Sequence, residues 1–365
     1  MKKIVNLLAI GAVLLGGAFA DEKDWTVEIQ AKMNAVNIED VAGSNPTVNA
    51  FPSDMFDDDT KVGFFYDGDK FEGGLEITPV FFWADDTFAA GTTPDPLKAF
   101  SALYAGVKFG EVAKLRGGIY EEHSDDHVEG FWVNSYLDEN KLGFVSDGFE
   151  VDKESDLVNG QALLDIYAGP ATIQIAPVAS KWTSSNKSFG AQARVILDFE
   201  PVAVSVNEQL GYSSTTDNFE NLASAYANLK FIENFPILVG AAFLTNSANS
   251  DLNRTAIELR LEKDFEALAF TFQNNMTFNK DHNVLYNGLG VCVPLAEMVS
   301  VGADIENYVD FGTDATAGKF RAMPYILYSP VEQAVLKVGV EFTSNWNSAS
   351  STLGIAIPVK IAVAF

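Results

Sequence analysis

The sequence STLGIAIPVKIAVAF, residues 351–365, carries a large apolar side chain at every second position from Leu353 to Phe365. The positions between them hold glycine, alanine, Pro358 and Lys360. Because successive side chains of a β-strand point to opposite faces, the segment predicts a strand with one continuous apolar face. A bare apolar strand promotes edge-to-edge aggregation in water, so the segment favours a strand whose apolar face lies against a non-aqueous medium.

The same period of two recurs along the whole chain. Between Trp25 and Ala35 the odd-numbered residues are apolar and the even-numbered residues are polar. Further alternating rows begin at Leu103, Ala162, Ala171, Phe189, Thr255, Val299 and Leu336. Repeated alternation of this kind predicts an all-β fold. Counting the segments gives about 18 strands, between 16 and 20, each of roughly 10 to 13 residues, which is close to the length that a tilted membrane strand requires.

The connections between these segments alternate between short and long. Short connections, rich in turn-forming residues, are predicted at Asp67–Asp69, Gly110–Val112, Gly169–Pro170, Glu200–Pro201, Glu233–Asn234 and Ser329–Glu332. Longer polar connections are predicted at Asp40–Asp59, Ala84–Pro96, Ser146–Asn159, Ser213–Asn218, Thr245–Asn253 and Ser344–Ser350. Short turns on one rim and longer loops on the other are typical of an antiparallel up-and-down barrel. Both ends then lie on the short-turn rim, and the strand number is even.

The N-terminus has the pattern of an export signal. Lys2 and Lys3 precede the apolar segment Ile4–Leu15, and Ala18-Phe19-Ala20 gives a small-residue cleavage site. We therefore expect residues 1–20 to be a signal peptide and residues 21–365 to form a single barrel domain. No later apolar run reaches the roughly 18 to 20 residues that a membrane-crossing helix needs, so a membrane would be crossed by strands.

Aromatic residues favour a membrane barrel over a large soluble β-sandwich, which would show the same alternation. Rings recur at the ends of the predicted strands, for example at Trp25, Tyr66, Phe71, Phe199 and Phe265. Aromatic side chains concentrate at the boundary between bilayer and water, where they form girdles around transmembrane barrels. In hydrocarbon every backbone polar group must be paired internally, and a closed barrel achieves this.

The end of the chain resembles the C-terminal strand of bacterial outer-membrane β-barrel proteins of the porin-like class. The matching positions are Phe365, Val363, Ile361, Val359 and Ile357. The resemblance implies export to the bacterial outer membrane, contact with its lipids, and recognition of the strand ending at Phe365 by the barrel-assembly machinery. It also leaves open a homotrimer. Pro358 is a departure from the pattern, because it removes one ladder donor from the closing strand.

Charge and composition exclude several functions. The formal net charge of −26 argues against nucleic acid as a partner, since phosphate binding needs clustered basic residues. The single cysteine, Cys292, is expected to be a small strand residue. His123 and His127 are expected in a solvated polar loop, since no confirming ligand set accompanies them. We expect no metal, no cofactor and no catalytic residues, and hence no enzyme.

The polar face of the strands supplies the candidate functional residues. The candidate pore-lining residues are Glu28, Lys32, Arg116, Arg194, Glu258, Arg260, Asp304, Glu306, Lys337 and Glu341. They could set ion selectivity through a transverse field between cations and carboxylates, or they could be structural ion pairs of the wall. The sequence favours a water-filled channel for passive diffusion of small hydrophilic solutes and ions, with a mild cation preference. A substrate-specific channel and a surface adhesin or structural barrel remain the alternatives.

Overall fold

The computed structural model describes residues 25–39, 61–77, 100–119 and 161–178, together with 188–364 apart from gaps of at most three residues at connections. Short pieces at 41, 47–50, 121–122 and 149–150 are also described. The expected signal peptide, residues 1–20, lies outside the described residues. Within the described part of the chain, no helix is long and apolar enough to span a membrane, which is a statement about helices alone.

The described secondary structure consists of β-strands. The first half of the chain forms β1 (Trp25–Glu39), β2 (Thr47–Ala50), β3 (Lys61–Asp67), β4 (Phe71–Ile77), β5 (Phe100–Phe109), β6 (Ala113–Ile119), β7 (Glu121–Glu122), β8 (Phe149–Glu150), β9 (Gln161–Ala168) and β10 (Ala171–Val178). The second half forms β11 (Ser188–Phe199), β12 (Val202–Ser213), β13 (Asn218–Leu229), β14 (Ile237–Asn246), β15 (Arg254–Phe265), β16 (Leu268–Asn279), β17 (His282–Ala296), β18 (Val299–Gly312), β19 (Thr316–Val331), β20 (Ala334–Gly339), β21 (Glu341–Trp346) and β22 (Ser351–Ala364).

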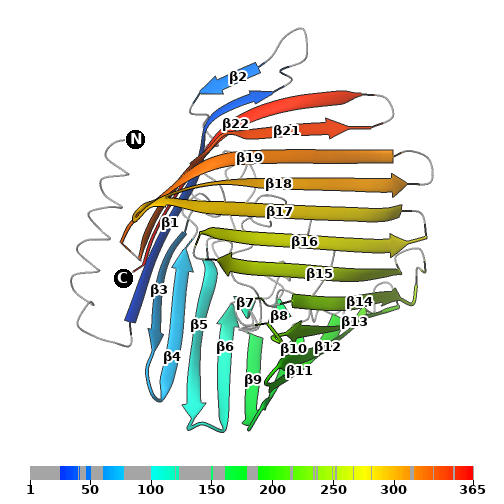
Figure 1. Cartoon of the computed structure of the whole chain (residues 1–365). Helices are drawn as coiled ribbons and strands as arrows, with labels where there is room; N and C mark the ends of the chain where they lie inside the picture. Colours follow the sequence, from blue (N-terminus) through cyan, green and yellow to red (C-terminus); the bar gives the residue numbers. More distant parts are fainter. Residues whose placement is uncertain are drawn as a thin grey trace, which may run out of the picture.

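The strands close into one antiparallel barrel of 18 wall positions, which confirms the predicted fold class (Figure 1). Each wall strand pairs with the next along the chain, and β22 returns to pair with β1 with Ile29 opposite Val363. β20 and β21 together occupy one wall position, because both pair with β19 and with β22. β2 pairs with the far end of β1, and β7 pairs with β8 in a separate small sheet.

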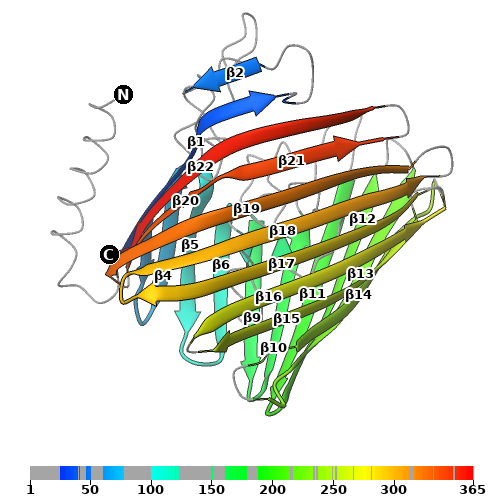
Figure 2. The same ribbon diagram turned by 45° about the horizontal axis from the view of Figure 1, so that its top comes forward.

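Both described ends of the wall, the start of β1 and the end of β22, lie at the same rim (Figure 2). That rim carries tight connections, such as residues 110–112 between β5 and β6 and residues 169–170 between β9 and β10. The predicted side for the termini and the predicted even number of strands are therefore confirmed. An even number of antiparallel strands gives this result, because each hairpin reverses the direction of the chain.

The seam between β1 and β22 contains an irregularity at the proline noted in the sequence. Pro358 lies opposite Asn34, and the register between the two strands shifts between Asn34 and Asn37. Proline cannot donate a ladder hydrogen bond, and a bulge is one of the places where a sheet accommodates it. The barrel therefore closes through antiparallel pairing of β1 with β22, with one local register shift beside Pro358.

Side chains divide between the two faces of the wall as the alternation predicts. The outward positions are large and apolar, and the exposed ones include Phe109, Val195, Phe199, Val206, Leu210, Phe243, Ile257, Phe265, Phe278, Phe311 and Ile326. Exposed phenylalanines lie near both strand ends, as Phe265 and Phe278 do on the hairpin of β15 and β16. This apolar outer surface with aromatic ends is the surface of a transmembrane barrel, and its architecture is that of bacterial outer-membrane proteins.

Two predicted connections differ in position from the observed ones, and two observed connections were not predicted. The predicted turn Ser329–Glu332 comes too early, because β19 continues to Val331 and its register to β20 shifts after Tyr328. The predicted loop Ser344–Ser350 is shorter, since β21 continues to Trp346. The short connections between β15 and β16 and between β17 and β18 were not predicted, because their residues lack the Gly, Pro, Asn and Asp pairs that mark turns in sequence.

Candidate functional site

The inner face of the barrel carries buried polar and charged side chains on many strands. On β15 and β16, Glu258, Arg260 and Gln273 are each at most 5% exposed, whereas Ile257 on the opposite face is 43% exposed. The strands force this division, because neighbouring residues point to opposite sides of the wall. The inner surface is therefore the part of the molecule where polar chemistry is concentrated.

The first polar network crosses the wall from β4 to β11. Arg116 on β6 lies between two carboxylates, with its Nε 3.1 Å from Glu72 Oε1 and its Nη2 2.8 Å from Asp165 Oδ2. Gln174 Nε2 donates to Asp165 Oδ1 at 3.0 Å, and Arg194 Nε donates to the Gln174 side-chain oxygen. The contacts from Arg116 to Asp165, Gln174 and Arg194 follow the pairing of neighbouring strands β6, β9, β10 and β11. Arg116 reaches Glu72 across β5, where Gly106 lies opposite both residues.

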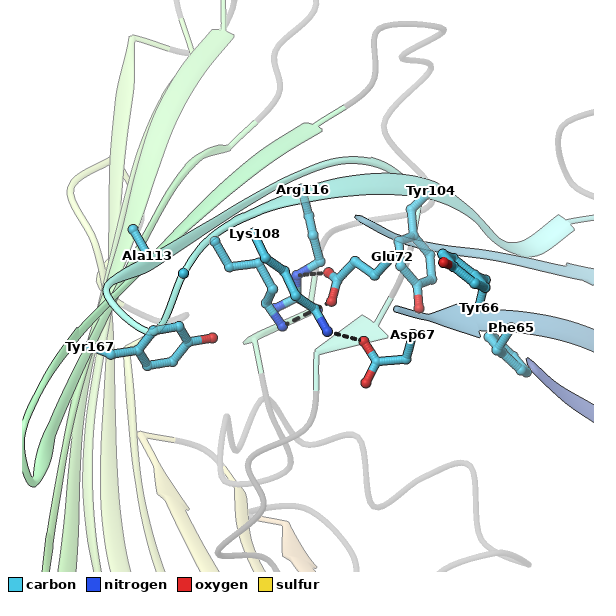
Figure 3. Close-up of a pocket in the computed structure, with 11 residues that line it drawn as sticks. Phe65, Tyr66, Asp67, Glu72, Tyr104, Lys108, Ala113, Arg116 and Tyr167 are labelled. Carbon is cyan, nitrogen blue, oxygen red and sulfur yellow. Dashed lines mark hydrogen bonds and ion pairs between the residues drawn. The ribbon is translucent and has the colours of Figure 1, made fainter. Parts of the chain in front are cut away.

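A pocket of about 400 Å³ opens beside this network near the turn rim (Figure 3). The rings of Phe65, Tyr66, Tyr104 and Tyr167 and the charged groups of Asp67, Glu72, Lys108, Lys114 and Arg116 line it. Its charges are internally compensated, since Lys108 Nζ pairs with Asp67 Oδ1 at 2.5 Å and Lys114 Nζ lies 3.4 Å from Glu72 Oε2. The pocket therefore offers aromatic faces and both donors and acceptors without a large excess of charge.

A glycine on β4 leaves space for two of the aromatic rings of the pocket. Gly74 lies opposite both Phe65 and Tyr104 on the neighbouring strands. A Cβ built on Gly74 would come within 2.4 Å of the Tyr104 ring and 2.9 Å of the Phe65 ring. The glycine thus leaves the space in which the two aromatic rings of the pocket lie against the wall.

The second network lies on β15 and β16. Arg260 pairs with Glu258, two residues earlier on the same strand, and Gln273 Nε2 donates to Glu258 Oε1 at 2.8 Å. All three side chains are buried, and Gln273 lies opposite Arg260 in the sheet. The charge of the arginine is therefore compensated within the wall itself.

The third network lies on β18 to β21. Lys337 Nζ is 2.7 Å from Asp304 Oδ2 and 3.8 Å from the centre of the Tyr325 ring. Arg321 Nη2 is 2.6 Å from Glu341 Oε2, and Arg321 Nη1 is 3.8 Å from Glu306 Oε2. Arg321 therefore bridges carboxylates on β18 and β21, as Arg116 bridges carboxylates on β4 and β9.

The structure places the predicted residues in three groups. Arg116 and Arg194 fall in the first network, Glu258 and Arg260 in the second, and Asp304, Glu306, Lys337 and Glu341 in the third. Glu28 lies on β1 opposite Gly63 and Ala364, apart from these networks. Lys32 lies on the same strand opposite Lys360, and its side chain lies outside the described part.

The contacts run along the wall, within one strand, between neighbouring strands or across one intervening strand, which is the arrangement of structural ion pairs rather than of a field across the lumen. Sequence reasoning missed Glu72, Asp165 and Gln174, which complete the first network. A signal for Asp165 exists, since it is a carboxylate between the apolar Leu164 and Ile166 of one strand. Its partner could not be found this way, because Arg116 is 49 residues away in the chain.

Among the residues that the structure describes, no group of three His, Cys, Asp or Glu side chains could hold a metal ion. His123 and His127 lie outside the described residues. Cys292 is a free, half-buried residue of β17, opposite Ala269 and Gly302.

Comparison with known proteins gives similarity in structure alone. No family model matches the sequence, and no curated protein matches it. OccAB3 of Acinetobacter baumannii is similar over 94% of this chain and 99% of its own, with 8% identity and a TM-score of 0.49. An anion-selective porin from Comamonas acidovorans covers 93% of this chain and 99% of its own, at 12% identity and a TM-score of 0.47. OmpT, an outer membrane protein of Vibrio cholerae, is similar in its trimer form over 94% of this chain and 98% of its own, at 12% identity and a TM-score of 0.42. Because the identities are 8% to 12% and the TM-scores are below 0.5, these similarities do not define the function of the chain.

Proposed function

We propose that this outer-membrane barrel forms a water-filled channel for passive diffusion of small hydrophilic solutes and ions. The observation that carries the proposal is the closed 18-strand wall with charged side chains on its inner face and apolar side chains on its outer face. Barrels of about 16 to 18 strands leave an aqueous channel along their axis. A polar inner surface favours water in that channel, and the proposal includes no catalytic activity.

The preference of the channel for ions follows from two opposing observations. The three wall networks contain six carboxylates and five basic side chains, so most of their charge is compensated within the wall. The whole chain carries a net charge of −26, which raises the local concentration of cations. We therefore propose a mild cation preference, weakened by added salt because salt screens exposed charge.

The pocket at the turn rim favours a second candidate, a channel with preference for one class of solute. Its volume of about 400 Å³ and its four aromatic rings suit a small polyhydroxylated solute such as a monosaccharide. Sugar hydroxyls both donate and accept hydrogen bonds, as do the compensated ion pairs of this pocket. This proposal places the solute contact on the wall strands β3 to β6 and β9.

The test is single-channel conductance in a planar bilayer, with the reversal potential measured under a salt gradient. Stepwise openings with a small cation-selective reversal potential support the channel. A silent bilayer, with protein shown by heat-modifiable gel migration to be a folded barrel, would refute it and favour the structural or adhesin alternative. Uptake of neutral monosaccharides and of disaccharides into liposomes separates a solute-selective channel from a general one.

Assembly belongs to the same proposal. Recognition of the closing strand by the barrel-assembly machinery, through the apolar row ending at Phe365, is proposed from the sequence, and Phe365 lies outside the described residues. Deletion of Phe365 is expected to lower the yield of heat-modifiable barrel in the outer membrane without changing synthesis. Equal yields would refute this role.

A further inference from the structure

The outer face of the barrel contains a carboxylate in the middle of its apolar belt. Glu208 on β12 has the same orientation as Val206 and Leu210, which are 51% and 50% exposed on the outer surface. Its cross-strand neighbours are Ala193 on β11 and Ala223 on β13. Among the described residues no side chain donates a hydrogen bond to Glu208 or pairs with it.

The position of Glu208 makes contact with a water layer difficult. It lies six residues beyond Val202, which begins β12 at the turn rim. At about 3.4 Å per residue and a tilt of about 40°, the carboxylate is about 15 Å from that rim, within an apolar band about 25 Å tall. An ionisable side chain at such a depth marks a functional contact by default, because hydrocarbon leaves its charge unsolvated.

A second polar patch lies on the outer face of β16, β17 and β18. Asn274, Asn287 and Asn307 are directly opposite one another in the sheet, so three amides form a row across three strands. Asn307 shares its face with the outward Ile305 and Phe311, which are 38% and 49% exposed. The row is therefore surrounded by lipid-facing apolar side chains.

The amide row is only partly satisfied within the chain. Asn274 Nδ2 donates to Asn287 Oδ1 at 2.7 Å, which uses the acceptor of Asn287. Within the described part of the chain, the amide hydrogens of Asn287 and Asn307 have no side-chain acceptor. An amide left unpaired in hydrocarbon is unfavourable, so these donors favour an acceptor from outside the barrel.

The two patches are complementary in chemistry and similar in height, but a single barrel cannot join them. An ionised carboxylate only accepts hydrogen bonds, and the amide groups of Asn287 and Asn307 have hydrogens to donate. Asn307 lies eight residues beyond the turn-rim end of β18, close to the height of Glu208 on its own strand. Strands β13, β14 and β15 separate the two patches on the wall, so the acceptor and the donors can meet only between two copies.

We infer that the barrel associates with a second copy of itself head to tail, with Glu208 of one copy accepting hydrogen bonds from Asn287 and Asn307 of the next. The alanines beside Glu208 allow the neighbouring wall to approach closely, as small residues do at protein contacts within membranes. A contact between two different patches repeats around an axis and closes into a ring when the rotation allows. This inference is independent of whether the channel is open.

Oligomeric state in mild detergent, measured by native mass spectrometry of the full folded chain, gives the first test. The wild type is expected to be an oligomer, and Glu208→Leu and the double variant Asn287→Leu/Asn307→Leu are each expected to reduce the oligomer at least tenfold at the same concentration. Ile326→Leu, a lipid-facing change outside both patches, is the matched control and keeps the oligomer. Heat-modifiable gel migration verifies that each variant is a folded barrel, and leucine is compatible with a lipid-facing strand.

Disulfide cross-linking gives the second test, in a Cys292→Ser background. Barrels with Ala223→Cys mixed with barrels with Ile305→Cys are expected to cross-link to each other, and neither variant is expected to cross-link to itself. A monomeric wild type, an oligomer that survives both leucine variants, or cross-links between identical positions would overturn the head-to-tail contact. Single-channel conductance of Glu208→Leu, measured separately, distinguishes failure of this contact from failure of the channel.

Discussion

Removal of the Lys337 ammonium from the third network is expected to destabilise the barrel strongly. Lys337 and Asp304 are 2% and 4% exposed and lie 2.7 Å apart, and the ammonium also lies over the Tyr325 ring. Lys337→Met keeps an unbranched apolar side chain of similar length but leaves Asp304 buried without its counter-ion. Breaking a buried pair from one side costs about 3 to 5 kcal/mol, because the remaining charge stays desolvated.

The expected loss can be separated from the loss of packing with two further variants. Asp304→Asn combined with Lys337→Met removes both charges, and its free energy of unfolding is expected to return to within about 1 kcal/mol of the wild type. Lys230→Met is the matched control, because Lys230 pairs with Asp198 at 3.2 Å while the two side chains are 40% and 56% exposed. An exposed pair of this kind contributes about 1 kcal/mol or less.

The assay is reversible urea unfolding in lipid vesicles, followed by fluorescence of the five tryptophans. The order of stability is expected to be wild type, double variant and Lys230→Met close together, with Lys337→Met well below them. If Lys337→Met lowers the free energy of unfolding no more than Lys230→Met does, the buried-charge effect is refuted, since water in the lumen would then solvate Asp304. It is also refuted if the double variant is no more stable than Lys337→Met, since packing would then explain the loss.

Three further predictions test the wall and the pocket. Gly118→Ala should destabilise the barrel by about 1 to 3 kcal/mol, because Gly118 has φ +142° and an added Cβ would lie 2.2 Å from the Leu103 carbonyl oxygen. Gly211→Ala is the control in the same urea assay, because a Cβ added at Gly211 meets nothing within 4 Å. Ile257→Arg on the outer face should cost about 2 to 4 kcal/mol more than Gln273→Arg on the inner face, and equal losses would contradict the assigned faces. Arg116→Gln removes a cation from the pocket, and it should shift the reversal potential towards cation selectivity by a few millivolts in a salt gradient; an unchanged potential would mean that permeating ions do not approach this wall.

Several features of this protein follow from the sequence because they depend on local alternation. The row from Leu353 to Phe365 predicts a strand that buries one face, and it pairs with β1 in the closed barrel. The tight turn at Gly169-Pro170 is predicted from residues that favour turn dihedrals, and it joins β9 to β10. Side-chain direction in a strand depends only on position parity, so the inner placement of Arg194 and Glu258 could also be predicted.

Only the tertiary structure decided which of these side chains meet. Arg116 and Asp165 are 49 residues apart, and Lys337 and Asp304 are 33 apart, so their pairing depends on the register between strands. A register change of one residue would turn every side chain of a strand to the other face, and alternation by itself does not specify which residue of the next strand lies opposite. The amide row on β16 to β18 and its separation from Glu208 depend on the same register. The sequence determined the barrel and its two faces because these are local properties, whereas the ion-pair networks, the pocket and the outer polar patches required the long-range pairing of strands.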